Sequence, residues 1–416
     1  SVSLLIKREG EEKNIEKTLV REDIKIKSVS YSGMIDSKTG YIKLTGFTEN
    51  AANEVKEALL ELKKDPNMKS LVLDLRGNPG GLLREAVDIV NLFVDRGTEV
   101  VSTKGKVKDW DKIYKATSDP IDTETPMAIL VDRGSASASE IVSGALQDLD
   151  RGIVIGQRTY GKGLVQQTRP LSYNSQLKVT VAKYYIPSGR CIQALDYSNR
   201  NDDGSVEKVP DSLITAFKTK NGRIVYDGGG VAPDVALEDF KYSNITASLM
   251  TKPYMFDYVS KYRMAHPTIP SAKTFKLSDT EYGDLVAYLN GKEFDYTTKS
   301  EKELNEFKDV AEKEKYFDNV KDEYEKLKEK VMHNKKADLN TYKKEISQLV
   351  EEEIASRYYF QKGRLEASIK TDSDIDSAMT TLGNKNKYTA LLTTIGKPDR
   401  PFNPVVSNKE KIKDKQ

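Results

Sequence analysis

The sequence has very little cysteine and histidine. Its 416 residues include one cysteine, Cys191, and two histidines, His266 and His333. A lone cysteine excludes an intrachain disulfide framework and a cysteine-rich metal site. Both histidines lie in the charged C-terminal half. We therefore expect neither to act as the base for a nucleophile in the first half, although either could fold back onto one. We also expect no metal ion and no other cofactor.

The sequence also has neither a large excess of one charge sign nor a long apolar run. The 66 basic and 64 acidic residues leave a net charge of +2, which gives no electrostatic case for binding nucleic acid. No apolar run approaches the roughly 18 residues of a transmembrane segment. The opening stretch, SVSLLIKREG, lacks the basic start and long apolar run of a signal peptide, as a mature or trimmed chain would.

Three patterns are present along the chain. Residues 1–30 alternate between apolar and polar positions around a turn, which predicts a β-hairpin. From residue 31 to residue 164, strand patterns alternate with helical ones, which predicts an α/β core with parallel pairing. We expect strands in 31–47 and at 70–75, 99–102, 128–131 and 153–155, and helices at 51–64, at 82–94 and from Ser137 onward. Alternation at 177–181 predicts a half-exposed antiparallel strand, and beyond residue 240 the chain is charged and helical.

Residues 134–167 combine small residues, a helix start, a short strand and a Gly-Lys-Gly turn. Ser137 follows a predicted buried strand and opens a helix, where free N–H groups and the helix dipole would stabilise an oxyanion. Small neighbouring side chains would let a substrate backbone approach. The alternative is that Ser137, like Ser135 and Ser139, only caps the helix, and the local sequence taken alone favours that alternative.

A serine nucleophile needs a base, and Lys162 is the candidate. A lysine can serve as a base when burial disfavours its charged form. Lys162 lies between two glycines, directly after a strand. If residues 162–166 are extended, Lys162 and Gln166 face the same way, and the Gln166 amide would orient the amine. The alternative is an ordinary lysine on a surface turn.

Two glycine-containing segments need separate interpretation. Residues 156–162, GQRTYGK, fit the first seven positions of a P-loop, but Gly163 stands where a magnesium-binding Ser or Thr is required. The residues that follow predict a strand, whereas a P-loop opens a helix, so we reject nucleotide binding. The turn at 76–81 follows a central strand and precedes a helix. Its N–H groups would complete an oxyanion hole, unless the glycines only serve the turn.

Five motifs, taken in order, resemble the tail-specific, or C-terminal processing, serine proteases of the S41 peptidase family. They are SLVLDLRGNPGG, DRGSASASEIVSGALQD, GQRTYGKGLVQQ, KYYIPSGR and GGGVAPD, and the resemblance covers residues 31–235. It implies a mixed α/β (α+β), crotonase-like protease core. It also implies that Ser137 is the nucleophile, Lys162 the general base and Gln166 the residue that orients the lysine.

The same resemblance implies further site residues. Ala138 and a glycine of the 76–81 turn would form the oxyanion hole, with Gly80 and Gly81 as the candidates, and Asp148 would have a supporting role. The implied activity is a serine endopeptidase that binds extended protein or peptide substrates and cleaves them near their C-termini through an acyl-enzyme. The alternative is a non-catalytic peptide-binding or scaffold member of the same fold.

The resemblance also implies how the chain is organised. Residues 1–30 resemble the final strands of the PDZ domain that usually precedes the protease core, and most of that domain is absent here. The core would span 31–238, a charged helical region 239–397, and a flexible tail 398–416. The helical region resembles extensions of bacterial envelope members, which implies a place in the bacterial cell envelope or periplasm. A homo-oligomer or a regulatory partner is left open.

Overall fold

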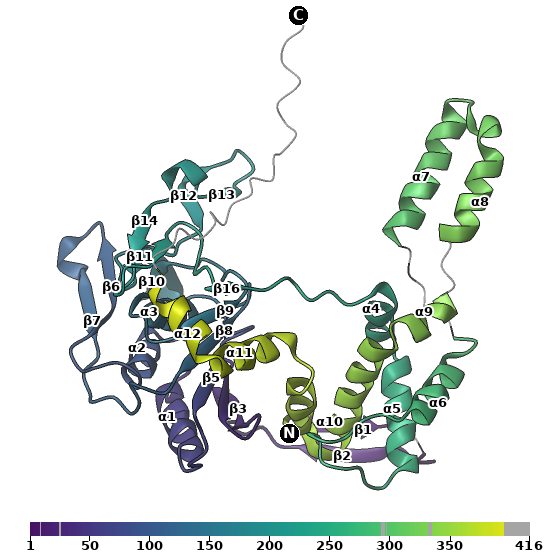
Figure 1. Ribbon diagram of the computed structural model, residues 1–416, viewed down its shortest axis with the longest axis horizontal. Coiled ribbons are helices and arrows are strands. Elements are labelled where there is room, and N and C mark those ends of the chain that lie inside the picture. Colours follow the sequence, from purple (N-terminus) through teal and green to yellow (C-terminus); the bar gives the residue numbers. More distant parts are fainter. Residues whose placement is uncertain (9, 25, 293–295, 297, 332–334, 395–416) are drawn as a thin grey trace, which may run out of the picture. The chain divides into compact units, whose positions relative to one another are not determined.

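The computed structural model describes residues 1–416 except 9, 25, 293–295, 297, 332–334 and 395–416, and it divides the chain into two compact units (Figure 1). The first, which we call the site unit, contains Lys25–Asp239 and Ser373–Gln416. The second, the helical unit, contains Ser1–Ile24 and Phe240–Asp372. The tail predicted at 398–416 lies outside the described residues.

A six-stranded sheet in the order β16-β9-β8-β5-β4-β3 forms the centre of the site unit. All neighbours pair in parallel except the edge strand β3. The largely apolar run SLVLD and the apolar run MAILV form β5 and β8 because central parallel strands are covered on both faces, and every residue of both strands is buried. The strands are β3 (Val29–Met34), β4 (Thr39–Leu44), β5 (Ser70–Asp74), β8 (Met127–Val131), β9 (Ile153–Gly156) and β16 (Val235–Ala236).

Helices cover both faces of this sheet. On one face, α1 (Ala51–Leu62), α2 (Leu83–Asn91) and α3 (Ala138–Asp148) share a hydrophobic core with alternate strand residues such as Leu73 and Ile129. The strand residues between these are equally buried, so the second face is covered as well. There α11 (Ser373–Gly383) contacts β5, β8 and β9, and α12 (Lys385–Thr393) contacts β9 (Figure 1).

A second, antiparallel sheet has the order β10-β11-β6-β7. Its strands are β10 (Leu164–Pro170), β11 (Gln176–Tyr185), β6 (Glu99–Gly105) and β7 (Lys112–Lys115). The predicted strands at 164–170 and 177–181 are confirmed. The prediction that the strand near 99–102 joins the parallel core was wrong, because β6 pairs antiparallel with β11 and β7. Two small ladders pair β12 (Leu195–Arg200) with β13 (Val206–Lys208) and β14 (Ala216–Lys218) with β15 (Ile224–Tyr226).

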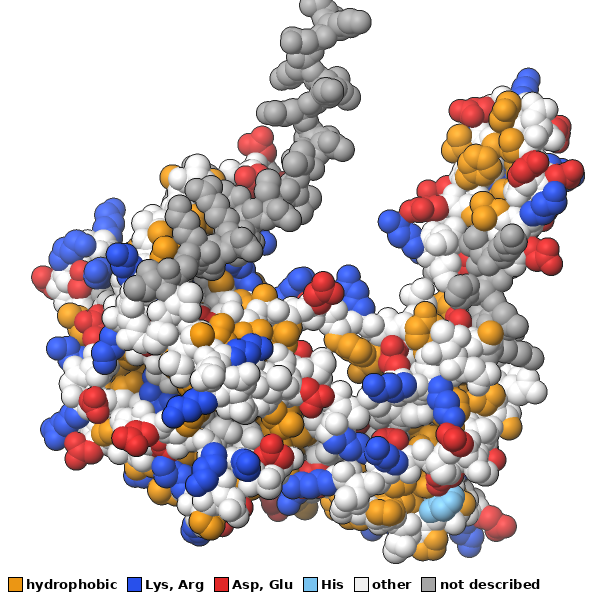
Figure 2. Space-filling model, viewed as in Figure 1, with side chains coloured by type: hydrophobic (Ala, Val, Ile, Leu, Met, Phe, Trp, Pro, Cys, Tyr) orange, Lys and Arg blue, Asp and Glu red, His pale blue; other side chains and the backbone are white. Residues whose placement is uncertain are grey.

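The helical unit begins with the predicted hairpin, in which β1 (Val2–Ile6) pairs with β2 (Ile15–Leu19). Its helices α4, α5, α6, α9 and α10 contribute to one hydrophobic core. The α7–α8 hairpin keeps half-exposed apolar side chains, and Figure 2 shows hydrophobic groups gathered on it. The helices are α4 (Asn244–Thr251), α5 (Tyr254–Ala265), α6 (Asp279–Leu289), α7 (Lys299–Lys313), α8 (Lys321–Val331), α9 (Lys335–Thr341) and α10 (Lys343–Ile369).

The mixed α/β fold and the helical C-terminal region agree with the expected fold class. The PDZ-like assignment of residues 1–30 and the predicted domain limits stay predictions. Within the described ranges, no helix is long and apolar enough to cross a membrane.

Candidate active site

Ser137 lies in the sharp turn between β8 and α3, where a parallel strand ends. Its backbone has φ 56° and ψ −112°, a conformation that few residues other than glycine adopt. Its side chain is partly exposed, whereas the neighbouring Ala136 and Ala138 are buried. A strained strand-to-helix turn of this kind exposes a serine hydroxyl at the edge of a sheet.

Glu140, in the first turn of α3, connects the Ser137 turn to the Lys162 turn. Its side chain is fully buried, and its carboxylate accepts four hydrogen bonds. One oxygen accepts from the Thr159 hydroxyl at 2.5 Å and the Gly161 N–H at 2.7 Å. The other accepts from the Ser137 and Lys162 N–H groups, both at 2.8 Å. Burial raises the pKa of Glu140, and these hydrogen bonds oppose the rise. One buried carboxylate therefore fixes the main chain at both predicted catalytic residues.

Tyr184 of β11 makes a second connection between the two turns. Its hydroxyl donates to the Lys162 carbonyl. Burial and the charge of Glu140 raise the pKa of Tyr184, and a hydrogen bond with the Ser137 side chain opposes that rise. The Tyr184 hydroxyl therefore lies close both to Ser137 and to the main chain of Lys162.

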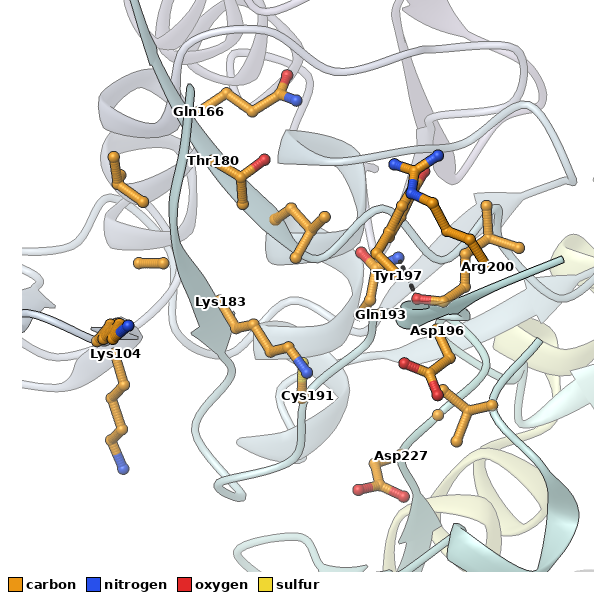
Figure 3. A pocket seen from close by; sticks show the side chains of 18 residues that line it. Lys104, Gln166, Thr180, Lys183, Cys191, Gln193, Asp196, Tyr197, Arg200 and Asp227 are labelled. Carbon is orange, nitrogen blue, oxygen red and sulfur yellow. Dashed lines mark hydrogen bonds between the residues drawn. The ribbon is translucent and has the colours of Figure 1, made fainter. Parts of the chain in front are cut away.

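The side chains of the predicted catalytic residues are not joined in this structure. Among the described residues, no hydrogen bond links Ser137 Oγ to Lys162 Nζ or Lys162 to Gln166, and the Lys162 side chain is exposed. The pairing of β10 with β11 shifts register between Val165 and Gln166. The extra residue, Val181, belongs to β11, so alternation along β10 is kept, but β10 begins only at Leu164 and does not include Lys162. The Gln166 side chain instead lines a pocket on this sheet (Figure 3).

The glycine-rich turn at 76–81 is held against the Ser137 turn by two residues. One carboxylate oxygen of Asp132 accepts from the N–H groups of Gly77 at 2.8 Å and Ser135 at 3.0 Å. The main-chain oxygen of Asn78, which is fully buried, accepts from the Ser139 hydroxyl at 2.9 Å. These bonds join the segments that follow β5 and β8, two neighbouring strands of the sheet.

The N–H groups of Ala138 and of a glycine in the 76–81 turn were predicted to form an oxyanion hole. Gly80 has φ +96°, and a Cβ added there would lie 2.6 Å from the Ala136 oxygen and 2.8 Å from the Ala138 nitrogen, so only glycine fits. The Gly80 N–H already donates to the Asn78 side chain at 2.9 Å. Within the described part of the chain, the N–H groups of Ala138 and Gly81 have no acceptor. Ala138 and Gly81 therefore stay the candidate donors, and Gly80 lies in close contact with the Ser137 turn.

Asp148 lies at the opposite end of α3 from Ser137. Its carboxylate lies 2.9 Å from the guanidinium of Arg190, and both side chains are fully buried. The other carboxylate oxygen accepts from the Ser188 N–H at 3.0 Å. Asp148 therefore neutralises a buried arginine and holds the turn at 187–190, which fits a supporting role.

Four residues of this arrangement were missed from the sequence: Asp132, Asn78, Glu140 and Tyr184. Only Glu140 had a readable signal, because Ser-x-x-Glu is the spacing of a capping box, in which the glutamate binds the N–H of the cap residue. Of the histidines, His266 belongs to the helical unit, where its Nδ1 lies 3.0 Å from the Tyr262 oxygen, and His333 lies outside the described residues.

Comparison with known proteins assigns families to both halves of the chain. Residues 38–198 match peptidase family S41, and residues 245–382 match the C-terminal helical domain of probable PDZ-proteases. A Bartonella bacilliformis protein named carboxy-terminal-processing protease is 41% identical over 197 residues, which are 47% of this chain and 45% of that protein. A Staphylococcus aureus protein named probable CtpA-like serine protease is 34% identical over 282 residues, which are 67% of this chain and 44% of that protein.

Among solved structures, the photosystem II D1 C-terminal processing protease is 31% identical, with a TM-score of 0.39 over 54% of this chain and 52% of that one. The chain spans less than half of the length of the two curated relatives. It contains a peptidase family S41 domain at residues 38–198, followed at 245–382 by the C-terminal helical domain of a probable PDZ-protease.

Proposed function

We propose that the chain is a serine endopeptidase that cuts protein substrates near their C-termini, with Ser137 as nucleophile and Lys162 as general base. The observation that carries this proposal is the buried Glu140 carboxylate, which binds the N–H groups of both residues. The two turns cannot separate without removing hydrogen bonds from a buried charge, and such a loss is costly. The family match at residues 38–198 supports the same activity.

In the proposed reaction, the Lys162 side chain turns toward Ser137 when a substrate covers the site. Exclusion of water favours the neutral amine, which takes the proton from Ser137 Oγ as this oxygen attacks the scissile carbonyl carbon. The N–H groups of Ala138 and Gly81 bind the oxyanion. The amine product leaves with the proton from Lys162, and an acyl ester remains on Ser137. Water, deprotonated by Lys162, then hydrolyses that ester. Gln166 holds the amine in the substrate-bound form.

The substrate is proposed to bind as an added strand on β10. This strand lies at the edge of its sheet and begins two residues after Lys162, and its side chains are half or fully exposed. An edge strand presents unpaired N–H and C=O groups that an extended peptide can pair with, whatever its side chains. The proposed pairing would place a scissile bond beside the base.

The test is cleavage of an internally quenched peptide by the full chain and by variants. Ser137→Ala and Lys162→Ala are each expected to lower kcat/KM at least about a thousandfold, because the two groups act as one unit. Matched controls are Ser143→Ala, on the same helix, and Lys178→Ala, on β11, and both should leave the rate unchanged. Cleavage at the parent rate by either site variant would disprove the dyad.

The second candidate is a non-catalytic peptide-binding protein. The observation that favours it is the missing hydrogen bond between Ser137 Oγ and Lys162 Nζ among the described residues. It predicts that peptides bind without turnover, so mass spectrometry of a peptide incubated with the parent chain separates the two candidates. A place in the bacterial cell envelope or periplasm, a PDZ contribution and an oligomeric or regulatory partner stay predictions of the family resemblance.

A further inference from the structure

A pocket of about 790 Å³ lies on the β10-β11-β6 sheet of the site unit. Gln166, Thr180 and Lys183 line it from the sheet, and the segment from Cys191 to Arg200 lines it from the opposite side (Figure 3). Lys183 and Tyr184 are consecutive on β11, so their side chains point to opposite faces of the sheet. Because Tyr184 reaches toward Ser137 and the Lys162 turn, the pocket is distinct from the place of the scissile bond.

Among the described residues that line the pocket, basic side chains outnumber acidic ones. Two acidic residues, Asp196 and Asp227, also line it, and Asp227 already accepts from the Thr215 N–H at 2.7 Å. A concave surface lined by uncompensated charge of one sign attracts and concentrates ligands of the opposite sign. Four basic side chains line the pocket, and none forms an ion pair with a described residue: Lys104, Lys106, Lys183 and Arg200.

The wall of the pocket also holds the turn that carries the proposed base. Gln193 lines the pocket, and its side-chain oxygen accepts from the Gly163 N–H at 2.8 Å. The next residue, Ala194, donates its N–H to the Gly161 oxygen at 2.9 Å. A Cβ on Gly163 would lie 2.7 Å from the Gln193 nitrogen, so the contact is close. A ligand in the pocket therefore lies directly behind the turn of Lys162.

We propose that this pocket binds an acidic segment of the substrate, separate from the scissile bond, through carboxylates that pair with its lysines and Arg200. The inference rests on the proposed peptidase function and names the substrate class, peptides that carry free carboxylates. The planar guanidinium of Arg200 can donate two hydrogen bonds to one carboxylate, and each lysine carries a single positive charge at the end of a flexible side chain. The carboxylates come from Asp or Glu side chains or from the C-terminus of the substrate, and both sources share one chemistry.

Cys191 allows occupancy of the pocket to be measured without catalysis. It is the only cysteine of the chain, it lines the pocket, and it is partly exposed. Figure 3 shows the Lys183 amine pointing toward it. The rate of its alkylation by iodoacetamide therefore reports whether a peptide occupies the pocket. The full chain with Ser137→Ala is used, so that no peptide is cut.

The probe is a glutamate-rich decapeptide, compared with the same peptide carrying Gln in place of Glu. At ten times its Kd, the acidic peptide should slow alkylation about tenfold, because about one site in eleven stays open. Adding the pair Lys104→Gln and Lys106→Gln should weaken binding about fourfold, since each exposed charge changes the equilibrium about twofold. The matched control, Lys112→Gln with Lys115→Gln on β7, removes the same charge outside the pocket and should leave binding unchanged.

Each peptide is made with a free and with an amidated C-terminus. If only amidation removes the protection of Cys191, the pocket binds the C-terminal carboxylate. If only the replacement of Glu by Gln removes it, the pocket binds acidic side chains. Equal protection by the uncharged, amidated peptide, or no protection by any peptide, overturns the inference. Cleavage by the parent chain without protection of Cys191 overturns this inference alone, whereas protection without cleavage overturns the proposed function alone.

Discussion

Replacing Glu140 by Gln tests whether one buried carboxylate holds the turns of Ser137 and Lys162 in place. Gln has nearly the same shape, but only one of its two terminal atoms can accept a hydrogen bond. Its NH2 group fits best beside the Thr159 hydroxyl, which can rotate to accept from it. The Gly161 N–H then loses its acceptor. The bonds from Ser137 and Lys162 remain, but to an uncharged oxygen.

The expected effects on stability and on activity differ in size. An unsatisfied buried N–H costs about 1–3 kcal/mol, and each of two remaining bonds weakens by about 1 kcal/mol when the acceptor loses its charge. Removing a buried charge relieves a desolvation penalty of several kcal/mol, in the direction that the raised pKa of Glu140 indicates. The free energy of unfolding should therefore change by about 2 kcal/mol or less. The loosened turn should lower kcat about a hundredfold, as a misplacement of about 1 Å does.

The assays are urea unfolding and peptide cleavage, with kcat and KM determined separately. A positioning role lowers kcat and leaves KM within about twofold, because substrate contacts are unchanged. The matched control is Glu351→Gln in the helical unit, where a largely buried glutamate accepts from the Leu277 N–H at 2.9 Å. That variant should lose stability and keep kcat. An unchanged kcat in Glu140→Gln, or an equal fall in both variants, would refute the reasoning.

Three further predictions concern the glycine turn, a buried ion pair and acid stability. Gly80→Ala places a Cβ 2.6 Å from a main-chain oxygen, so it should lower the free energy of unfolding in urea by about 3 kcal/mol and also lower kcat. The control Gly97→Ala, at φ +89° in open space, should lower the free energy of unfolding by only about 1 kcal/mol. Equal losses in the two variants would contradict the prediction. Asp148→Ala leaves the buried Arg190 without its carboxylate and should lower the free energy of unfolding by about 3–5 kcal/mol. The control Asp239→Ala, whose arginine partner is exposed, should lower it by less than about 1 kcal/mol. A loss for Asp148→Ala as small as that of the control would count against its supporting role. Burial opposes ionisation of Asp122, but hydrogen bonds from a lysine and a threonine lower its pKa to about 2. A lowered folded-state pKa gives stability above the unfolded pKa that is lost as the pH falls through the folded value. The advantage of the parent over Asp122→Asn, about 1 kcal/mol after solvent screening, should therefore decline below about pH 4 and be gone by about pH 1, and an advantage that persists in full at about pH 1 would exclude this origin.

Most of the central sheet was predictable because its signals are local. β8 is apolar at every position and β5 at its three central positions, as expected for strands covered on both faces. The partner of a strand is not local. β6 was placed in the wrong sheet because its near neighbour β7 was not predicted, and its other neighbour β11 lies about 80 residues further along the chain, where pairing leaves no mark in local periodicity.

The candidate site shows the same division between local and distant information. The spacing of Ser137 and Glu140 indicates a capping box, but the sequence does not show that the same carboxylate also binds Gly161 and Lys162. The expected contact of Gln166 with Lys162 assumed one extended strand over residues 162–166, but β10 begins only at Leu164. The sequence motifs indicate which residues belong to the candidate site, whereas hydrogen bonds between distant segments determine their arrangement.

The return of α11 and α12 to the sheet of the site unit has a consequence for synthesis of the protein. About 240 residues separate the end of β9 from the end of α12, so a ribosome needs about 12–50 s to supply the second set of covering helices. Until then, buried positions such as Ala128, Leu130 and Ile153 have no helix over them. The nascent chain therefore exposes an aggregation-prone sheet face and should depend on chaperones until its last helices emerge.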